Sequence, residues 1–322
     1  MSIQAGDVDQ YLSRSAAFRL ALPPASSPAP YDKFGWMQQE SPETILTATT
    51  DPDSSLSFSQ AREIAESHHF VFLCGLHRSG TTLLFRMLRE HPEMSGFANN
   101  KVATNWTPLE DEGQFLQGIY PPAMCYGGPG SFAFAPEAHL TESSDLLTPD
   151  NKAQLAVDWF PYWDLAKRFL LEKSPPHLLM TRFLQSVFPN SSFVIIVRHP
   201  VAVSLATTKW STNSLDSLLE HWLVAHETFQ SDRPHLQRVL MVAYESLAEE
   251  PAATLRRICA FLGVPPHETS FAATTEHNQG YFAQWREMAE NPETGASLRE
   301  WTARYEARVS AFGYSLQNLA LR

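Results

Sequence analysis

The sequence predicts an α/β fold, a three-layer sandwich with a central, mainly parallel sheet and a lid made of helices and loops. The first observation behind it is a set of short, continuously apolar runs, and the second is that each run is followed by a stretch typical of a helix. Strands that are apolar on both faces need cover on both faces, which alternating helices provide in a parallel sheet. The strands are expected at residues 69–74, 169–172, 192–197 and 239–243, and the helices at 79–90, 175–188, 200–209, 213–229 and 251–262.

Several segments lie outside this alternation. Residues 1–66 are rich in Pro, Ser and Asp, which predicts an N-terminal arm that is loosely structured or carries one or two helices. Residues 67–322 are expected to form the main domain. Within it, residues 97–150 are long and irregular enough to be a lid or a substrate-facing insertion. Further cover for a site is expected from residues 269–290 and from a final helix at 296–312.

The composition restricts the function. Lys and Arg number 24 and Asp and Glu number 35, so the formal net charge is −11. This balance argues against coating nucleic acid or an anionic membrane, and a polyanionic ligand must therefore be held by a local cluster of cations. Three cysteines without a CxxC pair indicate neither a disulfide framework nor a zinc site. No apolar run approaches the roughly 20 residues of a membrane span, so we expect a cytoplasmic protein.

A glycine-containing turn follows the first expected strand. Residues 75–82 read Gly-Leu-His-Arg-Ser-Gly-Thr-Thr, and the spacing of the two glycines matches a phosphate loop that leads into a helix. Backbone N–H groups at such a helix N-terminus bind oxyanions. The residue after Gly80 is Thr81 rather than the usual Lys, and Arg78 is the cation of the turn. The sequence thus predicts a strand–phosphate loop–helix unit.

Further charged residues follow two later strands, at what should be the same edge of the sheet. Arg198 follows the strand at 192–197, and the strand at 169–172 ends in Glu172 and is followed by Lys173. A site for a nucleoside triphosphate normally has a magnesium-binding carboxylate at the end of a second strand. A strand that ends in Arg198 indicates instead a second anion contact, so a ligand with several phosphate-like groups and no metal is expected.

These residues resemble the sulfotransferases that use 3′-phosphoadenosine 5′-phosphosulfate (PAPS). The resemblance covers roughly residues 69–285 and rests on Arg78-Ser79-Gly80-Thr81-Thr82, on Arg198-His199-Pro200, on Glu172-Lys173-Ser174-Pro175 and on Tyr244-Glu245-Ser246-Leu247. It implies that the turn binds the 5′-phosphosulfate and that Arg198 binds the 3′-phosphate.

Three further expectations come from the resemblance. Tyr244 is expected to line the nucleotide pocket, and residues 278–281 are expected to form a loop that closes over the nucleotide. The family's serine eight residues after the arginine is Ala206 here. Ser204 lies about 200° around the helix from that position, so it can be the hydroxyl partner of the 3′-phosphate only if the helix start is shorter here. Thr207 and Thr208 are the alternatives.

The implied reaction moves a sulfuryl group from PAPS to an acceptor hydroxyl and releases 3′-phosphoadenosine 5′-phosphate (PAP). Lys173 and Arg78 are the candidates for stabilising the leaving group in place of a metal. A general base must accept the hydroxyl proton, and Glu112 is preferred because it lies in the insertion after the phosphate helix. His177, His77 and Asp111 are the other candidates for this base.

The acceptor is the least defined part of the prediction. The aromatic, Gly- and Pro-rich residues 120–136 indicate a partly apolar acceptor that is lipid-like, polyketide or phenolic, while carbohydrate and tyrosine hydroxyls remain open. The alternatives are a P-loop kinase that uses ATP and a non-catalytic nucleotide-binding module. The sequence does not indicate an oligomeric state.

Overall fold

A five-stranded parallel sheet forms the centre of the protein. The computed structural model describes residues 57–97, 112–272, 274 and 276–320 of the chain. The strand order is β2-β3-β1-β4-β5, and every neighbouring pair is parallel. Their bounds are β1 His69–Gly75, β2 Met94–Gly96, β3 Phe169–Lys173, β4 Ser191–Val197 and β5 Val239–Ala243. The predicted strands and the α/β sandwich are confirmed, and β2 is a short edge strand that the sequence pattern did not indicate.

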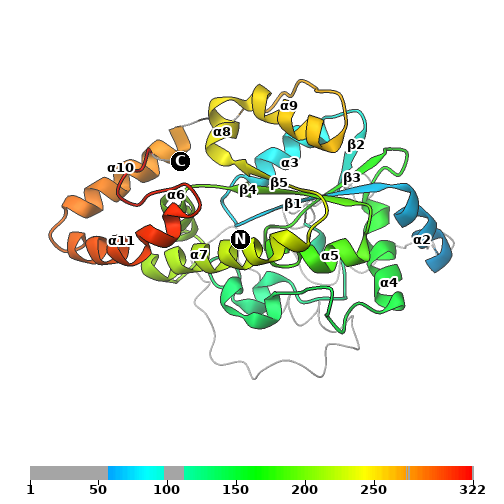
Figure 1. Cartoon of the computed structure of the whole chain (residues 1–322), viewed down its shortest axis with the longest axis horizontal. Coiled ribbons are helices and arrows are strands. Elements are labelled where there is room, and N and C mark those ends of the chain that lie inside the picture. The colour runs from blue at the N-terminus through cyan, green and yellow to red at the C-terminus, as the bar shows by residue number, and fades with distance from the viewer. Residues whose placement is uncertain (1–56, 98–111, 273, 275, 321–322) are drawn as a thin grey trace, which may run out of the picture.

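Helices cover both faces of this sheet (Figure 1). On β1, Val71 and Leu73 pack with α3 and α9, whereas Phe70 and Phe72 pack into the opposite cluster with α4, α5 and α7. Successive side chains of a strand point to opposite faces, so a run that is apolar throughout requires this double cover. The helices are α2 Phe58–Ser67, α3 Thr81–Arg89, α4 Pro149–Trp159, α5 Thr181–Val187, α6 Pro200–Thr207, α7 Leu215–Asp232, α8 Tyr244–Glu249, α9 Pro251–Leu262, α10 Glu276–Glu290 and α11 Gly295–Ser310.

Two predicted segments differ from the structure. The helix expected at 175–188 is divided into a 3₁₀-helix, Pro175–Leu179, and α5. The backbone leaves the helical region at Met180, with φ −126° and ψ 15°, and this residue separates the two elements. The loop expected at residues 278–281 was wrong, because these residues lie in the first turns of α10. The segment still covers the site, but as a regular helix.

The predicted insertion is partly core and partly surface. Residues 98–111 lie outside the described part of the chain. The section from 112 onward contains 3₁₀-helices at Gly113–Phe115, Ala123–Tyr126, Phe132–Phe134 and Pro136–Ala138. Tyr120 and Phe132 are fully buried in the cluster under β1, while Phe134 remains exposed. The described part of the insertion therefore packs into the core of the domain through these aromatic residues.

The end of the predicted N-terminal arm is helical. Ser57 caps α2 through a capping box with Gln60. Ala61 of this helix is buried in the main core, so α2 packs on the domain. Residues 1–56 of the predicted arm lie outside the described residues. Among the helices that the structure describes, none has both the length and the hydropathy that crossing a bilayer requires.

Candidate active site

The turn after β1 has the backbone of an anion-binding loop. Arg78 has φ 69° and Gly80 has φ 98°, both in the left-handed region, and α3 begins at Thr81 directly after them. Non-glycine residues rarely adopt this conformation, and such strain concentrates at functional sites. The N–H groups of the first helical turn have no acceptor within the helix, and the buried Ser79 Oγ has no hydrogen-bond partner among the described residues. Residues 79–82 therefore offer a cradle of donors to an anion.

Each glycine of the turn is also required by its packing. A Cβ at Gly75 would lie 2.5 Å from the Ile196 carbonyl oxygen on β4. A Cβ at Gly80 would lie 2.6 Å from Cδ2 of the Tyr244 ring. Tyr244 begins α8 directly after the edge strand β5, and its ring packs against the turn at Gly80.

Arg198, at the end of β4, lies against this turn. Its Nη1 donates to the Arg78 carbonyl oxygen at 2.7 Å, and its Nε donates to Asn278 Oδ1 at 2.7 Å. The buried Nη2 has no partner among the described residues. Burial lowers the pKa of Arg198, and the neighbouring Tyr244, Glu245 and Tyr281 oppose this effect. An arginine stays charged in proteins. The Nη2 group of Arg198 is therefore a charged donor that an anion could satisfy.

Aromatic rings and a further cation surround the same position. The Arg198 guanidinium lies 4.3 Å from the centroid of the Tyr244 ring and 5.7 Å from that of Tyr281. Lys209 Nζ lies 6.0 Å from the centroid of the Tyr281 ring. Arg78 Cζ lies 5.9 Å from the ring of Trp210, which is exposed. An acidic chain thus carries a local cationic cluster with planar groups beside it.

Lys173, at the end of β3, forms an ion pair with Glu112. The Nζ–Oε1 distance is 2.8 Å, and the side chains are 2% and 15% exposed. Burial opposes ionisation of Glu112, but Lys173, His77 and a hydrogen bond from Gln114 outweigh it and lower the pKa of this carboxyl group. Glu112 is therefore a carboxylate at neutral pH, beside a buried ammonium group. Asp111, the adjacent candidate, lies outside the described residues.

His77 lies in the turn, within the electrostatic reach of this pair. Burial lowers its pKa to about 4, with Lys173 and Arg78 acting in the same direction and Glu112 against it. The imidazole is thus neutral near pH 7, and its buried Nδ1 has no partner among the described residues. Its ring contacts Phe132 of the insertion at a centroid distance of 5.7 Å.

His177 and Glu172 are fully buried and bonded to one another. His177 Nδ1 lies 2.7 Å from Glu172 Oε2, and His177 Nε2 lies 2.7 Å from the Tyr120 hydroxyl. Glu172 also accepts hydrogen bonds from Gly113 N at 2.8 Å and Ser174 Oγ at 2.6 Å. With both ring nitrogens engaged and no exposure, His177 is placed to hold the insertion against β3. This geometry favours a structural role over the predicted catalytic one, and it occupies the oxygens of Glu172 that a metal ion would require.

Ser204 lies apart from the contacts of Arg198. It lines a small cavity of about 10 Å³ together with Leu76, His77, Gly130, Val203, Thr207, Leu218 and His221. Its buried Oγ has no partner among the described residues, while Thr208 Oγ1 donates to the Leu205 carbonyl oxygen at 2.7 Å. None of the side-chain partners of Arg198 lines this cavity, so the geometry does not support Ser204 as a ligand of the group that Arg198 binds.

The roles of three site residues were only partly anticipated from the sequence. Asn278 and Tyr281 were assigned to a loop, and Glu245 was noted only as part of a motif. Glu245 Oε1 accepts from Asn278 Nδ2 at 2.8 Å and from His199 N at 3.0 Å. The one available signal was the motif at 244–247, because it directly follows a strand at the functional edge of the sheet.

One group of possible metal ligands occurs among the described residues, on the α3–α9 side of the sheet. It consists of His91, Cys259 and His267. His91 bonds to the Pro265 carbonyl oxygen and the Glu93 N–H, and His267 Nε2 bonds to the Met87 carbonyl oxygen. His267 Nδ1 lies 3.8 Å from Cys259 Sγ. These contacts engage the ring nitrogens in tying α3 to the segment after α9.

The parallel sheet, the strand–turn–helix unit and the strand-end cations define the P-loop-like class of α/β protein. A sequence profile described as the sulfotransferase family matches residues 71–269, and the chain belongs to this family.

Curated relatives agree with this assignment. The chain is 25% identical over 240 residues to protein-tyrosine sulfotransferase A of Caenorhabditis elegans, which covers 68% of this chain and 57% of that protein. It is 27% identical over 213 residues to protein-tyrosine sulfotransferase 2 of Gallus gallus, covering 62% of this chain and 52% of that protein. The chain thus spans little more than half the length of these relatives. The crystal structure of sulfotransferase STF1 from Mycobacterium tuberculosis H37Rv aligns with a TM-score of 0.45 and 19% identity, covering 72% of this chain and 75% of that chain.

Proposed function

We propose that the chain transfers a sulfuryl group from PAPS to an acceptor hydroxyl. The observation that carries this proposal is the direct contact between Arg198 and the phosphate turn, formed across 120 residues of sequence at 2.7 Å. It brings two anion-binding elements together at the carboxyl edge of the sheet, where open α/β sheets bind ligands. PAPS carries a 5′-phosphosulfate and a 3′-phosphate, and two adjoining anion sites suit such a nucleotide.

The donors present fit this nucleotide. Ser79 Oγ and Arg198 Nη2 are buried polar atoms without partners in the described part of the chain, and a buried donor of this kind is costly unless a ligand or water satisfies it. We assign the 5′-phosphosulfate to residues 79–82 with Arg78, and the 3′-phosphate to Arg198. Tyr244 would then border the nucleotide, because its ring contacts both Gly80 and Arg198.

In the proposed reaction the acceptor oxygen attacks sulfur in line with the leaving group. The bond between sulfur and the bridging oxygen breaks, PAP leaves, and the hydroxyl proton passes to Glu112. Lys173 and Arg78 would stabilise the charge that develops on the bridging oxygen, which is the role that cations serve at such sites. Glu112 supports this scheme because it is ionised and lies 2.8 Å from Lys173. His77, neutral and adjacent, is the alternative base.

A kinase that uses ATP and magnesium is the second candidate from the sequence. Its metal would need an available carboxylate at a neighbouring strand end. Glu172 holds that position, but its oxygens accept from Gly113, Ser174 and His177. The donor set therefore favours sulfuryl transfer with side-chain cations, with no metal site assigned.

The acceptor is proposed to be a hydroxyl on an aromatic or partly apolar molecule. Phe134 and Trp210 are large exposed apolar side chains near the site. Trp210 contacts Arg78 of the phosphate turn, and Phe134 contacts His221, which lines the same small cavity as His77. The names of the relatives add tyrosine hydroxyls to the acceptors to be tested. Phenols, tyrosyl peptides, lipid-like or polyketide alcohols and carbohydrates form the screen.

The experiment is a calorimetric titration of the full chain with PAP in the absence of magnesium, beside ATP with magnesium. Micromolar or tighter binding of PAP that is lost in Arg198→Ala is the expected result. Binding of ATP with magnesium alone would reject the proposal in favour of a kinase. Turnover of PAPS in the acceptor screen, with Glu112→Gln as the control, separates an enzyme from a non-catalytic nucleotide-binding module.

A further inference from the structure

The Arg198 side chain is held by directional contacts. Nε and Nη1 each donate to one fixed oxygen, on Asn278 and Arg78, and the guanidinium lies over the rings of Tyr244 and Tyr281. A guanidinium has its donors in a rigid planar fork. Fixing Nε and one terminal nitrogen therefore fixes where the buried Nη2 points. The direction of the Nη2 donor therefore depends on Asn278 Oδ1, the oxygen that accepts from Nε.

That oxygen belongs to an amide with a single chemically acceptable orientation. Asn278 is 5% exposed, its Oδ1 accepts from Arg198 Nε, and its Nδ2 donates to Glu245 Oε1 at 2.8 Å. Arginine can only donate and an ionised carboxylate can only accept. Turning the amide over would place donor against donor and acceptor against acceptor. The carboxylate of Glu245 thus dictates which end of Asn278 faces Arg198.

Glu245 is itself fixed from two other elements. Its Oε1 also accepts from the N–H of His199, the residue after Arg198, at 3.0 Å. Its Oε2 accepts from the hydroxyl of Tyr314 in the C-terminal segment at 2.9 Å. A carboxylate with three donors is constrained in position and orientation, so it is a firm reference point for the amide.

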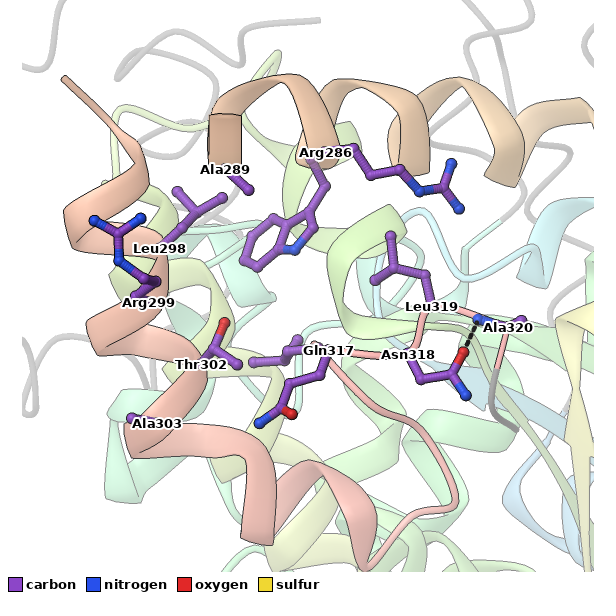
Figure 2. Close-up of a pocket in the computed structure, with 12 residues that line it drawn as sticks. Arg286, Ala289, Leu298, Arg299, Thr302, Ala303, Gln317, Asn318, Leu319 and Ala320 are labelled. Carbon is purple, nitrogen blue, oxygen red and sulfur yellow. Dashed lines mark hydrogen bonds between the residues drawn. The ribbon is translucent and has the colours of Figure 1, made fainter. Parts of the chain in front are cut away.

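The face of α10 that carries Asn278 is also the face that anchors the helix on the domain. Asn278 and Tyr281 are three residues apart, which places them on one face of α10. Phe282 and Trp285 are buried, and the Phe282 ring contacts His199 at a centroid distance of 4.7 Å. Figure 2 shows Arg286 and Ala289 of α10 facing Leu298 of α11 and Leu319 of the C-terminal segment across a cavity of about 610 Å³. The helix is therefore a support that holds Asn278 toward the sheet edge.

We propose that Glu245 and Asn278 form a positioning relay that aims Arg198 at the 3′-phosphate, and that this relay sets the preference for a 3′-phosphorylated nucleotide. The inference rests on the proposed function, since it presumes that Arg198 binds the 3′-phosphate. Ala206 leaves α6 without the hydroxyl expected there, and Ser204 lines another cavity. Recognition of the 3′-phosphate would therefore depend more heavily on how Arg198 is directed. Asn278 and Glu245 are positioning residues, because they act through Arg198.

The test compares two nucleotides that differ only in the 3′-phosphate, PAP and adenosine 5′-monophosphate, by calorimetry on the full chain. In Asn278→Ala the dissociation constant for PAP should rise about tenfold, as expected for a lost charge-assisted contact. The constant for adenosine 5′-monophosphate should change less than about twofold. Glu245→Ala should act in the same direction, and Glu245→Gln, which keeps one acceptor oxygen, should lose less. Gln284→Ala, at an exposed position of α10 outside residues 278–281, is the matched control and should bind both nucleotides as the wild type does.

The outcomes separate the relay from the function on which it rests. A wild-type chain that does not bind PAP would reject the proposed function itself. Wild-type binding of PAP with an unchanged ratio of the two constants in Asn278→Ala and Glu245→Ala would overturn the relay alone. An equal loss of affinity for both nucleotides would also overturn it, because it would show a merely structural role. Thermal denaturation of each variant confirms folding, and Glu245→Gln provides the milder variant if an alanine variant does not fold.

Discussion

Lys173 at the end of β3 donates to Glu112 across 61 residues of sequence, with Nζ and Oε1 2.8 Å apart. The proposed cation for the leaving group and the proposed base for the acceptor thus neutralise one another. Breaking a buried pair by removing one partner is strongly destabilising because the other charge is left without compensation. A neutral isostere such as Gln at position 112 removes the charge but keeps an oxygen that can accept from Lys173. Substitutions at this pair must therefore preserve shape if they are to report on chemistry.

Glu112→Gln tests the proposed base. The amide cannot accept a proton, so the turnover number for PAPS and a hydroxyl acceptor should fall by about 10²- to 10⁴-fold, the usual contribution of a general base. The dissociation constant for PAP should stay close to the wild-type value, because Arg198 and the phosphate turn are unchanged. Glu137→Gln, at an exposed acid of the same insertion, is the control. Retained turnover in Glu112→Gln would exclude Glu112 as the base and leave His77 and Asp111 as the candidates to test next.

His177→Ala tests whether this histidine is structural. The change leaves Glu172 buried without its imidazole partner and Tyr120 without its acceptor or donor at Nε2. The free energy of unfolding in urea should fall by about 3 kcal/mol. The affinity of the folded fraction for PAP should be retained. His235→Ala, at an exposed histidine, should leave both quantities unchanged. A variant with full stability but no turnover would restore His177 as a catalytic residue.

The parts of the site that the sequence could predict are those encoded by adjacent residues. The phosphate turn is defined by two glycines, a strand and a helix within one short segment, and Arg198 directly follows an apolar strand. Parallel strands end at one edge, so their placement followed from the fold class alone. Lys173 could be predicted in the same way, because it stands at the carboxyl end of the apolar strand β3.

The parts that sequence reasoning missed depend on contacts between distant elements. Asn278 is 80 residues from Arg198 in the chain, and its partner Glu245 is 33 residues from it. No local pattern encodes the contact between these residues, and the loop expected at 278–281 came from the family resemblance. The burial of His177 could not be predicted, because it depends on contacts with distant residues, among them Tyr120 of an insertion without periodicity. Glu172, the strand-end acid that a magnesium ion would require in a kinase, is bonded to His177 and to Gly113 of the same insertion.

The pH dependence of stability can be predicted from His226. This imidazole is fully buried, its Nδ1 lies 2.7 Å from the Trp222 carbonyl oxygen, and burial lowers its pKa from 6.5 to about 4. Below pH 6.5 the unfolded chain takes up a proton that the folded chain refuses until about pH 4, so stability should fall as the pH decreases through this window.

His226→Gln should remove that contribution, about 1.4 kcal/mol per pH unit within the window. The measurement is the free energy of unfolding in urea at about pH 7.5 and about pH 5 for the wild type and the variant. The difference between the two pH values should be smaller in the variant. An equal difference in both proteins would show that His226 is protonated in the folded chain as readily as in the unfolded one.

A pair of glycines provides the last prediction, about the phosphate turn. Gly80 has φ 98° and would place a Cβ 2.6 Å from the Tyr244 ring, whereas no atom lies within 4 Å of a Cβ built at Gly280 in α10. Gly80→Ala should therefore lower the free energy of unfolding by about 1–3 kcal/mol and abolish PAP binding, because both the donors of the turn and the ring beside Arg198 must shift. Gly280→Ala should raise stability by about 0.5–1 kcal/mol, as alanine does inside a helix, and should leave PAP affinity unchanged. Both quantities can be measured on each variant by urea denaturation and calorimetry. PAP binding that survives in Gly80→Ala would mean that the nucleotide does not occupy this turn, whatever the stability of the variant.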